Sequence, residues 1–212
     1  MNPKQMHYET LAQTLIKNLE KRRMEACYCA TAREAMEKAL SYLPAGCTVA
    51  FGGSMTLEET GTLDALRARD DITLLDRAAA ATPEEKKQLY HDALSADYYF
   101  MSTNAVTNDG ELVNIDGIGN RVAALVYGPE HVIVMTGMNK AAATVEEAVS
   151  RVHNTATPMN CKRLGKNTPC AATGVCADCL SPDCICNQVV ITRRSGIQGR
   201  IKVILIGEEC GY

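Results

Sequence analysis

The alternation of short apolar runs with amphipathic segments constrains the fold of this chain more than any other feature. Strand-like composition recurs at 26–30, 47–51, 72–75, 96–103, 111–115, 131–136, 189–192 and 201–206. Helical spacing of apolar residues recurs at 3–23, 31–40, 56–67, 82–94, 121–127 and 144–153. Strands that alternate with helices form a mostly parallel sheet with helices on both faces. We therefore expect one α/β domain, for which 212 residues, 46% of them apolar, provide enough core.

Local signals support these boundaries. Thr31 with Glu34, and Thr82 with Glu85, have the spacing of a capping box at a helix start. The run Asn108-Asp109-Gly110 is typical of a hairpin turn. We divide the chain into an α/β domain over 1–157, a cysteine-rich metal-binding loop over 158–188 inserted in that domain, and closing strands of the same domain over 189–212.

Cysteine is concentrated near the end of the chain. Six of the ten cysteines lie in one segment: Cys161, Cys170, Cys176, Cys179, Cys184 and Cys186. The core pattern is Cys170-x5-Cys176-x2-Cys179-x6-Cys186, with Cys161 and Cys184 as additional thiols. Thiolates bind Zn²⁺ and iron–sulfur iron strongly, and a long loop without secondary structure needs a source of order. The spacing therefore predicts a metal centre on Cys170, Cys176, Cys179 and Cys186.

The nature of that centre is less constrained. Zinc ribbons usually carry two Cys-x2-Cys pairs, whereas this loop has one pair flanked by single cysteines, which favours a 4Fe-4S cluster with zinc as the alternative. A redox-active dithiol at Cys176 and Cys179, or thiols that only pack, are further interpretations. Cys27, Cys29 and Cys47 lie in apolar strands, where a buried free thiol is the better interpretation.

Two polar segments follow predicted strands. Gly52-Gly53-Ser54 leaves bare backbone N–H groups before a helix, which suits an anion, although the same glycines serve a plain tight turn. The second segment, from 102 to 121, is dense in polar residues where strands end, the usual ligand position in open α/β sheets. Its candidate ligand-binding residues are Asn104, Glu111, Asn114, Asn120 and Arg121. Glu59 and Asp116 are the best candidates for a catalytic general base.

Several classes of function are not expected. A net charge of −3 without a long charged run gives no indication of nucleic-acid binding. No apolar run approaches the roughly 18 residues of a membrane span, and no secretory h-region follows the first residues. We expect a cytoplasmic protein, in which structural disulfides are rare.

At these motifs the chain resembles the lactate-utilisation (LUD-domain) family, related to lactate utilisation protein C. The resemblance rests on residues 51–61 (FGGSMTLEETG), on residues 102–123 and on the tail from Thr168 to Asn187, and it covers nearly the whole chain. It implies the NagB/RpiA/CoA-transferase-like α/β fold, whose relatives bind phosphosugars, CoA esters or folates at the C-terminal ends of the strands. It also links the chain to L-lactate oxidation by a multi-protein iron–sulfur system.

Three functions follow as hypotheses. The first is an iron–sulfur subunit or accessory factor in oxidation of lactate or another 2-hydroxy acid, with a small anionic ligand held at the glycine-rich loops. The second is a stand-alone isomerase or transferase of the NagB/RpiA type with a structural zinc. The third is a sensor of metal or redox state. The expected partners are a small anionic or phosphorylated ligand, lactate-oxidation proteins and further copies of the chain.

Overall fold

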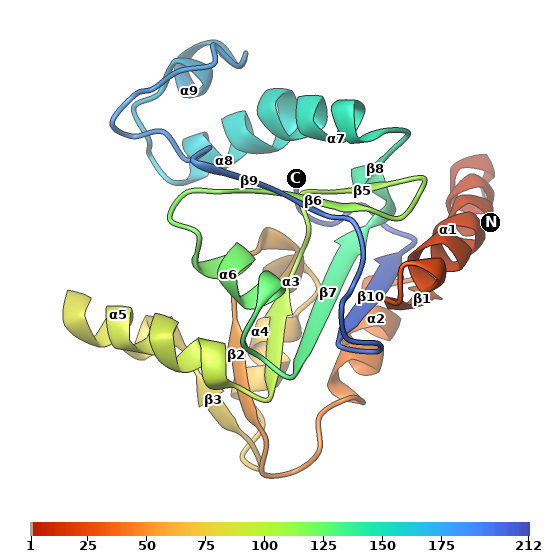
Figure 1. Cartoon of the computed structure of the whole chain (residues 1–212), viewed down its shortest axis with the longest axis vertical. Helices are drawn as coiled ribbons and strands as arrows, with labels where there is room; N and C mark the ends of the chain where they lie inside the picture. The colour runs from red at the N-terminus through yellow and green to blue at the C-terminus, as the bar shows by residue number, and fades with distance from the viewer. Residues whose placement is uncertain (1) are drawn as a thin grey trace.

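A six-stranded, all-parallel sheet forms the body of the molecule (Figure 1). The computed structural model describes residues 2–212. In spatial order the strands are β1 (Glu25–Cys29), β10 (Ile201–Ile206), β7 (His131–Gly137), β4 (Tyr98–Met101), β2 (Thr48–Phe51) and β3 (Thr73–Leu75). The predicted α/β class with a mostly parallel sheet is confirmed.

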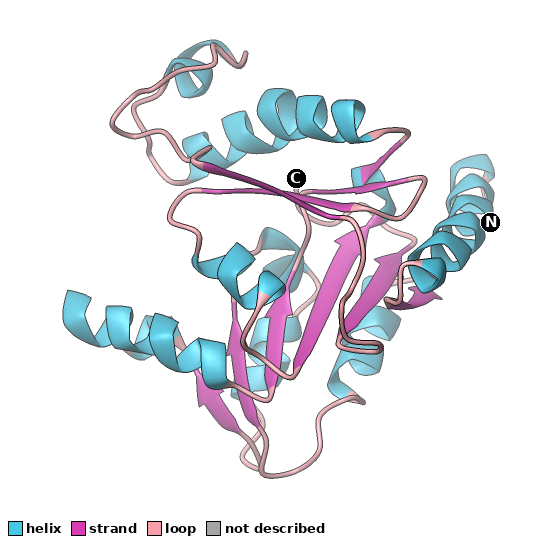
Figure 2. Ribbon diagram, in the orientation of Figure 1, coloured by secondary structure: helices cyan, strands magenta, loops and turns pink. Residues whose placement is uncertain are grey.

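The two faces of this sheet bury separate sets of apolar side chains. Val132 and Val134 of β7 point to one face, whereas Ile133 and Met135 point to the other, as the two-residue period of a strand requires. The first face packs against α1 (Pro3–Lys21) and α6 (Asn120–Val126). The second packs against α2 (Ala32–Leu40), α3 (Met55–Glu59) and α4 (Thr62–Arg67). Helices therefore cover both faces, as predicted, and Figure 2 shows this arrangement.

The second sheet was not expected as a separate layer. It has four strands in the order β8 (Ala141–Ala142), β5 (Ala105–Thr107), β6 (Leu112–Asp116) and β9 (Gln188–Thr192). The strands β5 and β6 are antiparallel across the predicted turn at Gly110, which has a φ of +87°. One face of this sheet contributes Val106 and Leu112 to the core under α1, and the other packs against α7 (Val145–Arg151).

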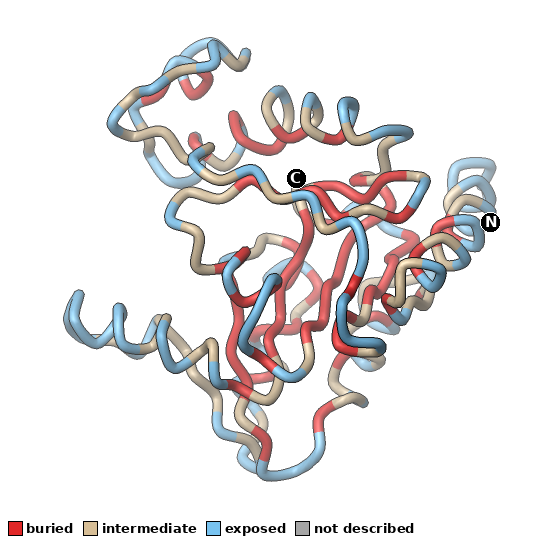
Figure 3. The backbone as a smooth tube through the Cα atoms, in the orientation of Figure 1, coloured by how far each residue is buried: buried red, intermediate tan, exposed pale blue. Residues whose placement is uncertain are grey.

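A long helical stretch lies over the second sheet and leads into the cysteine-rich segment. It runs from α7 through a π-helical turn, η4 (Val152–Ala156), into α8 (Thr157–Arg163). The segment expected to be a loop from 158 therefore begins as helix. After a turn, α9 (Pro169–Thr173) follows, and the chain from 174 to 187 has no regular structure. Figure 3 shows that this part of the backbone is largely exposed or half-buried.

The helix starts agree with the sequence. Thr31 and Thr82 accept the N–H groups of Glu34 and Glu85 at 3.2 and 3.1 Å, so the predicted N-caps of α2 and α5 (Pro83–Asp92) are confirmed. The helix expected over 56–67 is instead divided into α3 and α4. The division falls at Gly61, whose φ of +72° cannot continue an α-helix. None of the helices in residues 2–212 has both the length and the apolar character needed to cross a bilayer.

Candidate functional site

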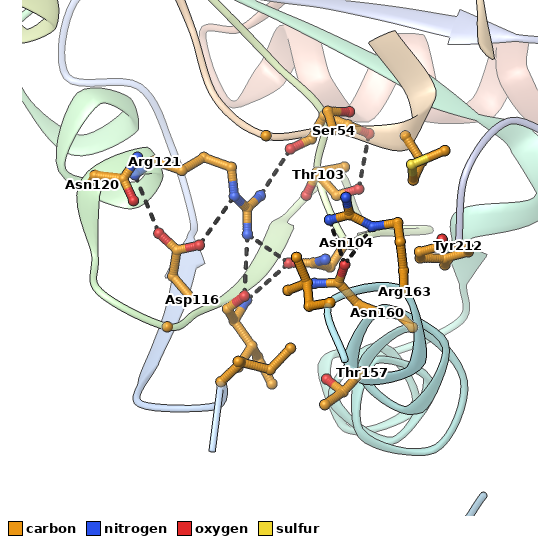
Figure 4. A pocket seen from close by; sticks show the side chains of 18 of the residues that line it. Ser54, Thr103, Asn104, Asp116, Asn120, Arg121, Thr157, Asn160, Arg163 and Tyr212 are labelled. Atoms are coloured by element: carbon orange, nitrogen blue, oxygen red, sulfur yellow. Dashed lines mark hydrogen bonds and ion pairs between the residues drawn. The ribbon is translucent and has the colours of Figure 1, made fainter. Parts of the chain in front are cut away.

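A pocket of about 300 Å³ lies where β4 and β2 of the main sheet end and α8 passes over them (Figure 4). Its polar lining comes from parts of the chain that are distant in sequence. The residues are Ser54, Arg77, Ser102, Thr103, Asn104, Asp116, Asn120, Arg121, Lys140, Thr157, Asn160 and Arg163, with the Tyr212 side chain beside them. The carboxyl ends of parallel strands are the usual position of ligands in such sheets.

Arg121 is the structural centre of this wall. It is 8% exposed, and its guanidinium donates to the Ser102 carbonyl at 2.9 Å, to the Asn114 side-chain oxygen at 2.6 Å and to that of Asn104 at 2.8 Å. It also donates to the Ile115 carbonyl at 3.2 Å and, through Nε, to Asp116 at 3.3 Å. All five of its N–H groups are thereby used. Arg121 joins β4, β6 and α6 rather than offering free donors to a ligand.

Asp116 is used in the same network. Besides the Arg121 side chain, its carboxylate accepts the backbone N–H groups of Arg121 at 3.2 Å and Val122 at 3.4 Å. These are the first N–H groups of α6, which have no partner inside the helix. As a candidate base, Asp116 does line the pocket, but its oxygens already accept hydrogen bonds and face a guanidinium.

Lys140 is the most unusual group in the pocket. Its side chain is 4% exposed, and its Nζ donates to Thr56 Oγ1 at 2.7 Å and to Ser102 Oγ at 3.1 Å. Within residues 2–212 no carboxylate lies within ion-pair distance of it. Burial, together with the positive charges of Arg151 and Arg121, lowers the pKa of Lys140 to about 7. A buried ammonium without a counter-ion is unfavourable, so an anion in the pocket would stabilise it.

Two further cations border the pocket. Arg77, from the 3-10 turn η1 (Arg77–Ala79), lies against Gly53 so closely that a Cβ atom there would stand 2.5 Å from its Nη2. Arg163 of α8 is exposed, and its guanidinium donates to Asn160 at 3.1 and 2.8 Å. Neither arginine forms an ion pair among the described residues. The pocket therefore carries more positive charge than negative.

The glycine-rich loop has a packing role as well as a place at the pocket. Gly52 donates its N–H to the Phe100 carbonyl at 2.9 Å, and a Cβ atom on it would lie 3.1 Å from the Arg121 side chain. Gly53 and Ser54 line the pocket, and Ser54 Oγ caps α3 by accepting the Leu57 N–H at 3.3 Å. Because the Ser54 hydroxyl accepts this bond, its proton is available to a ligand.

Four of the residues predicted for the ligand or catalytic site, Gly52 among them, do not line the pocket. Glu59 is exposed, and its carboxylate accepts the Gly211 N–H at 2.6 Å, so it fastens the end of the described chain. Glu111 forms an ion pair with Arg22 at 2.5 Å beside the hairpin. Asn114 is fully buried behind Arg121, while Asn104 and Asn120 do line the pocket.

Lys140, Arg77 and Arg163 were not among the residues predicted for the site. An Asn-Lys pair after a strand is common in protein sequences. Each of these three cations is brought to the pocket by contacts between parts of the chain that are distant in sequence. One signal was available for Lys140. It lies in the short turn Met138–Lys140, which directly follows the buried strand β7.

The cysteines of the tail form two groups. Cys161 of α8 and Cys170 of α9 are 0% and 6% exposed, and their Sγ atoms are 3.8 Å apart. Ile185 packs against this pair. Cys186 is half-buried, with its Sγ 3.4 Å from Thr157 Oγ1, and burial raises its pKa to about 11. Cys176 lies instead beside His153, with 3.4 Å between Sγ and Nδ1.

The residues predicted to hold a metal are of a suitable chemical type, because thiolates are the preferred ligands of zinc and iron–sulfur iron. In residues 2–212, no group of three or more His, Cys, Asp or Glu side chains is gathered closely enough to hold an ion. Of the four predicted ligands, Cys170 is paired with Cys161, a thiol outside the predicted set. Thr157 lines the pocket and contacts Cys186, so the tail and the pocket are adjacent.

The fold and this site define an α/β protein with a cationic pocket at the strand ends and a thiol-rich tail beside it. The LUD domain family model matches residues 12–206, so the chain belongs to the LUD domain family. A DUF162 family protein from Deinococcus radiodurans has a similar structure, with a TM-score of 0.54, 14% identity, and coverage of 94% of this chain and 98% of that one.

Ribose 5-phosphate isomerase A from Methanocaldococcus jannaschii is a more distant structural neighbour. Its TM-score is 0.36 at 15% identity, over 55% of this chain and 56% of the isomerase. None of the curated proteins matches the chain. Membership of the LUD domain family connects the chain with lactate utilisation.

Proposed function

We propose that this LUD-domain protein binds a small anionic ligand in the pocket under α8 and acts as an accessory factor in oxidation of L-lactate or another 2-hydroxy acid. The observation that carries the proposal is Lys140, a buried cation that lines the pocket and has no carboxylate partner in residues 2–212. A carboxylate or phosphate on the ligand would supply the missing counter-charge.

The charges around Lys140 favour the same class of ligand. Arg77 and Arg163 stand at the border of the pocket without ion pairs, and the one acidic side chain of the described lining, Asp116, is already bound to Arg121. Two opposite charges attract far more strongly in a partly buried site than in water. A ligand with one carboxylate would use Lys140, and a phosphorylated ligand could also contact an arginine.

Each residue of the pocket has a definable role in this proposal. Lys140 pairs with the ligand anion, while Thr56 and Ser102 fix the direction of its ammonium by accepting two of its three protons. The Asn104 side-chain oxygen is used by Arg121, which leaves its amide N–H groups for the ligand. Because the pKa of Lys140 is about 7, the same amine can hold or release a proton near neutral pH.

The isomerase hypothesis lacks a comparable observation. It requires a carboxylate that is free to move a proton, and Glu59 does not line the pocket whereas Asp116 is bound by a guanidinium and two backbone N–H groups. We therefore retain anion binding as the function of the pocket.

The cysteine-rich tail is proposed to hold an iron–sulfur cluster, with zinc as the alternative. A cluster would supply one-electron transfer beside the pocket, and Thr157, which borders both, lies between them. We place the protein in the cytoplasm, where reduced thiols are available to metals, and expect lactate-oxidising proteins and further copies of the chain as partners.

The pocket is tested by comparing L-lactate and pyruvate with L-lactamide, which has the shape of lactate but no charge. Calorimetry on the purified full chain should detect binding of a carboxylate or of inorganic phosphate and none of lactamide. The variant Lys140→Met, which keeps most of the side-chain volume, should bind these anions at least about tenfold more weakly. Equal binding of lactate and lactamide, or no binding of any anion, would reject the proposal.

The tail is tested separately by anaerobic purification followed by measurement of iron, acid-labile sulfide and zinc. A brown protein that dithionite bleaches, containing iron and sulfide, would support the cluster. Stoichiometric zinc without iron would replace the cluster by the alternative, and a metal-free protein would reject both.

A further inference from the structure

The helices α8 and α9 bring together two thiols that the spacing of the sequence does not pair. Cys161 and Cys170 are nine positions apart, and Lys166 closes the turn between their helices by donating its N–H to the Cys161 carbonyl at 2.9 Å. Both thiols are buried, and their sulfur atoms lie 3.8 Å apart. The pair is therefore held by backbone structure on both sides and does not depend on the exposed part of the tail.

The distance between the Cys161 and Cys170 sulfur atoms can be compared with the distances expected for a disulfide, for a single metal ion and for a 4Fe-4S cluster. A disulfide requires about 2.05 Å, so the two are separate thiols. Two thiolates on the same tetrahedral ion, each about 2.3 Å from it, lie about 3.8 Å apart. In a 4Fe-4S cluster each cysteine binds a different iron, which holds the sulfurs further apart. The observed separation matches two ligands of one metal atom, and it is also the distance at which the Cys170 thiol donates to Cys161 Sγ.

The segment that would complete such a site lies against the pair. Ile185 packs on Cys161, Cys170 and Ala171, whereas its neighbour Cys186 packs against the cluster under α7. The Cys186 Sγ lies 3.4 Å from Thr157 Oγ1, one helical turn before Cys161. The Cys186 N–H donates to Cys184 Sγ at 3.4 Å, an N–H···S bond of the kind that stabilises a thiolate ligand. Cys176 accepts a similar N–H···S bond from Asp178 at 3.4 Å but lies beside His153, and Cys179 has no hydrogen bond among the described residues.

The geometry points to Cys161 and Cys170 as two ligands of one tetrahedral metal atom, with the segment Cys184–Cys186 completing its coordination. This inference rests on the proposed presence of a metal in the tail and changes its ligand set. The ion is then Zn²⁺ or a single iron atom held by thiolates alone. Cys161 takes the place that the sequence pattern gave to Cys179.

The test measures metal bound per chain in the full-length protein, purified anaerobically, and in the single variants Cys161→Ser, Cys170→Ser and Cys179→Ser. Cys47→Ser, a buried thiol in the body, serves as the control for loss of a packed sulfur. Circular dichroism and the thermal midpoint establish that each variant is folded. We expect Cys161→Ser and Cys170→Ser to lose metal to the same extent, with an affinity for added Co²⁺ reduced more than about tenfold, and Cys179→Ser to keep it.

Cobalt also reports the ligands directly, because the intensity of its sulfur-to-metal absorption rises with the number of thiolates. That intensity should fall in Cys161→Ser and be unchanged in Cys179→Ser. Full metal content and unchanged cobalt absorption in Cys161→Ser, with loss in Cys179→Ser, would overturn the assignment while leaving a metal centre in the tail. A wild-type protein that binds neither its own metal nor Co²⁺ would reject the assignment together with the proposed centre. It would leave the anion pocket untouched.

Discussion

The body of the molecule and its cysteine-rich tail are ordered by different means. In the six-stranded sheet, the central strands β7 and β10 are buried along nearly their whole length, and their side chains fill a core on each face. In the tail, Leu180 is 100% exposed and Val175 is 62% exposed. Burial of apolar surface is the main favourable term in folding, so it accounts for the body but not for residues 174–187.

Among the described residues, the apolar cluster centred on the tail is small. It consists of Cys161, Cys170 and Ala171 with Ile185 packed against them. Segments with few buried contacts open locally at low free energy unless another interaction holds them. A metal bound by thiolates would be such an interaction, since its binding free energy becomes folding free energy. The contrast yields four tests, beginning with the largest effect.

Arg121→Met should destabilise the body most. It removes a buried guanidinium and leaves Asp116, Asn114 and the Ser102 carbonyl without their donor, at a cost of about 3–5 kcal/mol in the free energy of unfolding. Urea denaturation measures the change. The control Arg163→Met removes an exposed arginine and should alter stability by less than about 0.5 kcal/mol. Equal stability of the two variants would show that the network around Arg121 is not what joins the loops.

The stability of the body should depend on pH through Lys140. Its folded pKa of about 7 lies below the ordinary value of 10.5, so between these limits the unfolded chain binds more protons than the folded chain. The unliganded protein should therefore gain stability as pH rises from about 7 toward 10.5, by up to about 1.4 kcal/mol per pH unit. In Lys140→Met this contribution should vanish, which urea denaturation at several pH values can measure. An identical pH slope in wild type and variant would contradict the burial of a titrating lysine.

Removal of metal should affect the tail and spare the body. After treatment with a chelator, cleavage by trypsin at Lys166 should accelerate by at least about tenfold, because metal binding no longer opposes local opening of the tail. The thermal midpoint of the body should stay the same. Mass spectrometry of the fragments measures the first effect and circular dichroism the second. Unchanged cleavage would show that the tail is ordered without a metal.

Two matched helix caps provide the finest comparison. Thr144 caps α7 in the body and Thr168 caps α9 in the tail, each accepting an N–H at 3.3 Å. Thr144→Ala should lower the free energy of unfolding by about 1 kcal/mol. Thr168→Ala should leave global unfolding unchanged and instead raise amide hydrogen exchange within 169–173. Similar effects of both substitutions on global unfolding would mean that the tail unfolds together with the body.

Local sequence signals were sufficient for most of the body. The capping threonines, the turn at Gly110 and the buried strands depend on neighbouring residues, so their positions could be predicted. The division at Gly61 was missed because a glycine within a helical pattern is compatible with either outcome. The second sheet was missed because β9 reaches β6 only across more than seventy residues of chain, a pairing that no local pattern specifies.

The residues of the pocket were harder to predict from the sequence, because they too are brought together by contacts between distant parts of the chain. The Lys140 ammonium is held by Thr56 and Ser102, and its pKa is lowered by burial and by the charges of Arg151 and Arg121. Most of these residues are far from Lys140 in sequence. Glu59 and Glu111 are polar residues near the predicted ligand-binding segments. The Glu59 carboxylate accepts the Gly211 N–H and the Glu111 carboxylate pairs with Arg22, so neither lines the pocket. Spacing selected Cys179 through its Cys-x2-Cys pair, whereas folding of α8 onto α9 brings Cys161 to Cys170.

The central claim is that a buried, unpaired lysine makes the pocket a site for anions. The most direct test is the dissociation constant for pyruvate, or for inorganic phosphate, measured by calorimetry at about pH 6 and about pH 9 on either side of the Lys140 pKa. Binding should be strong at the lower pH and weaken at the higher one, and Lys140→Met should bind weakly at both. Equal affinity at the two pH values, or a variant that binds as wild type does, would contradict the account.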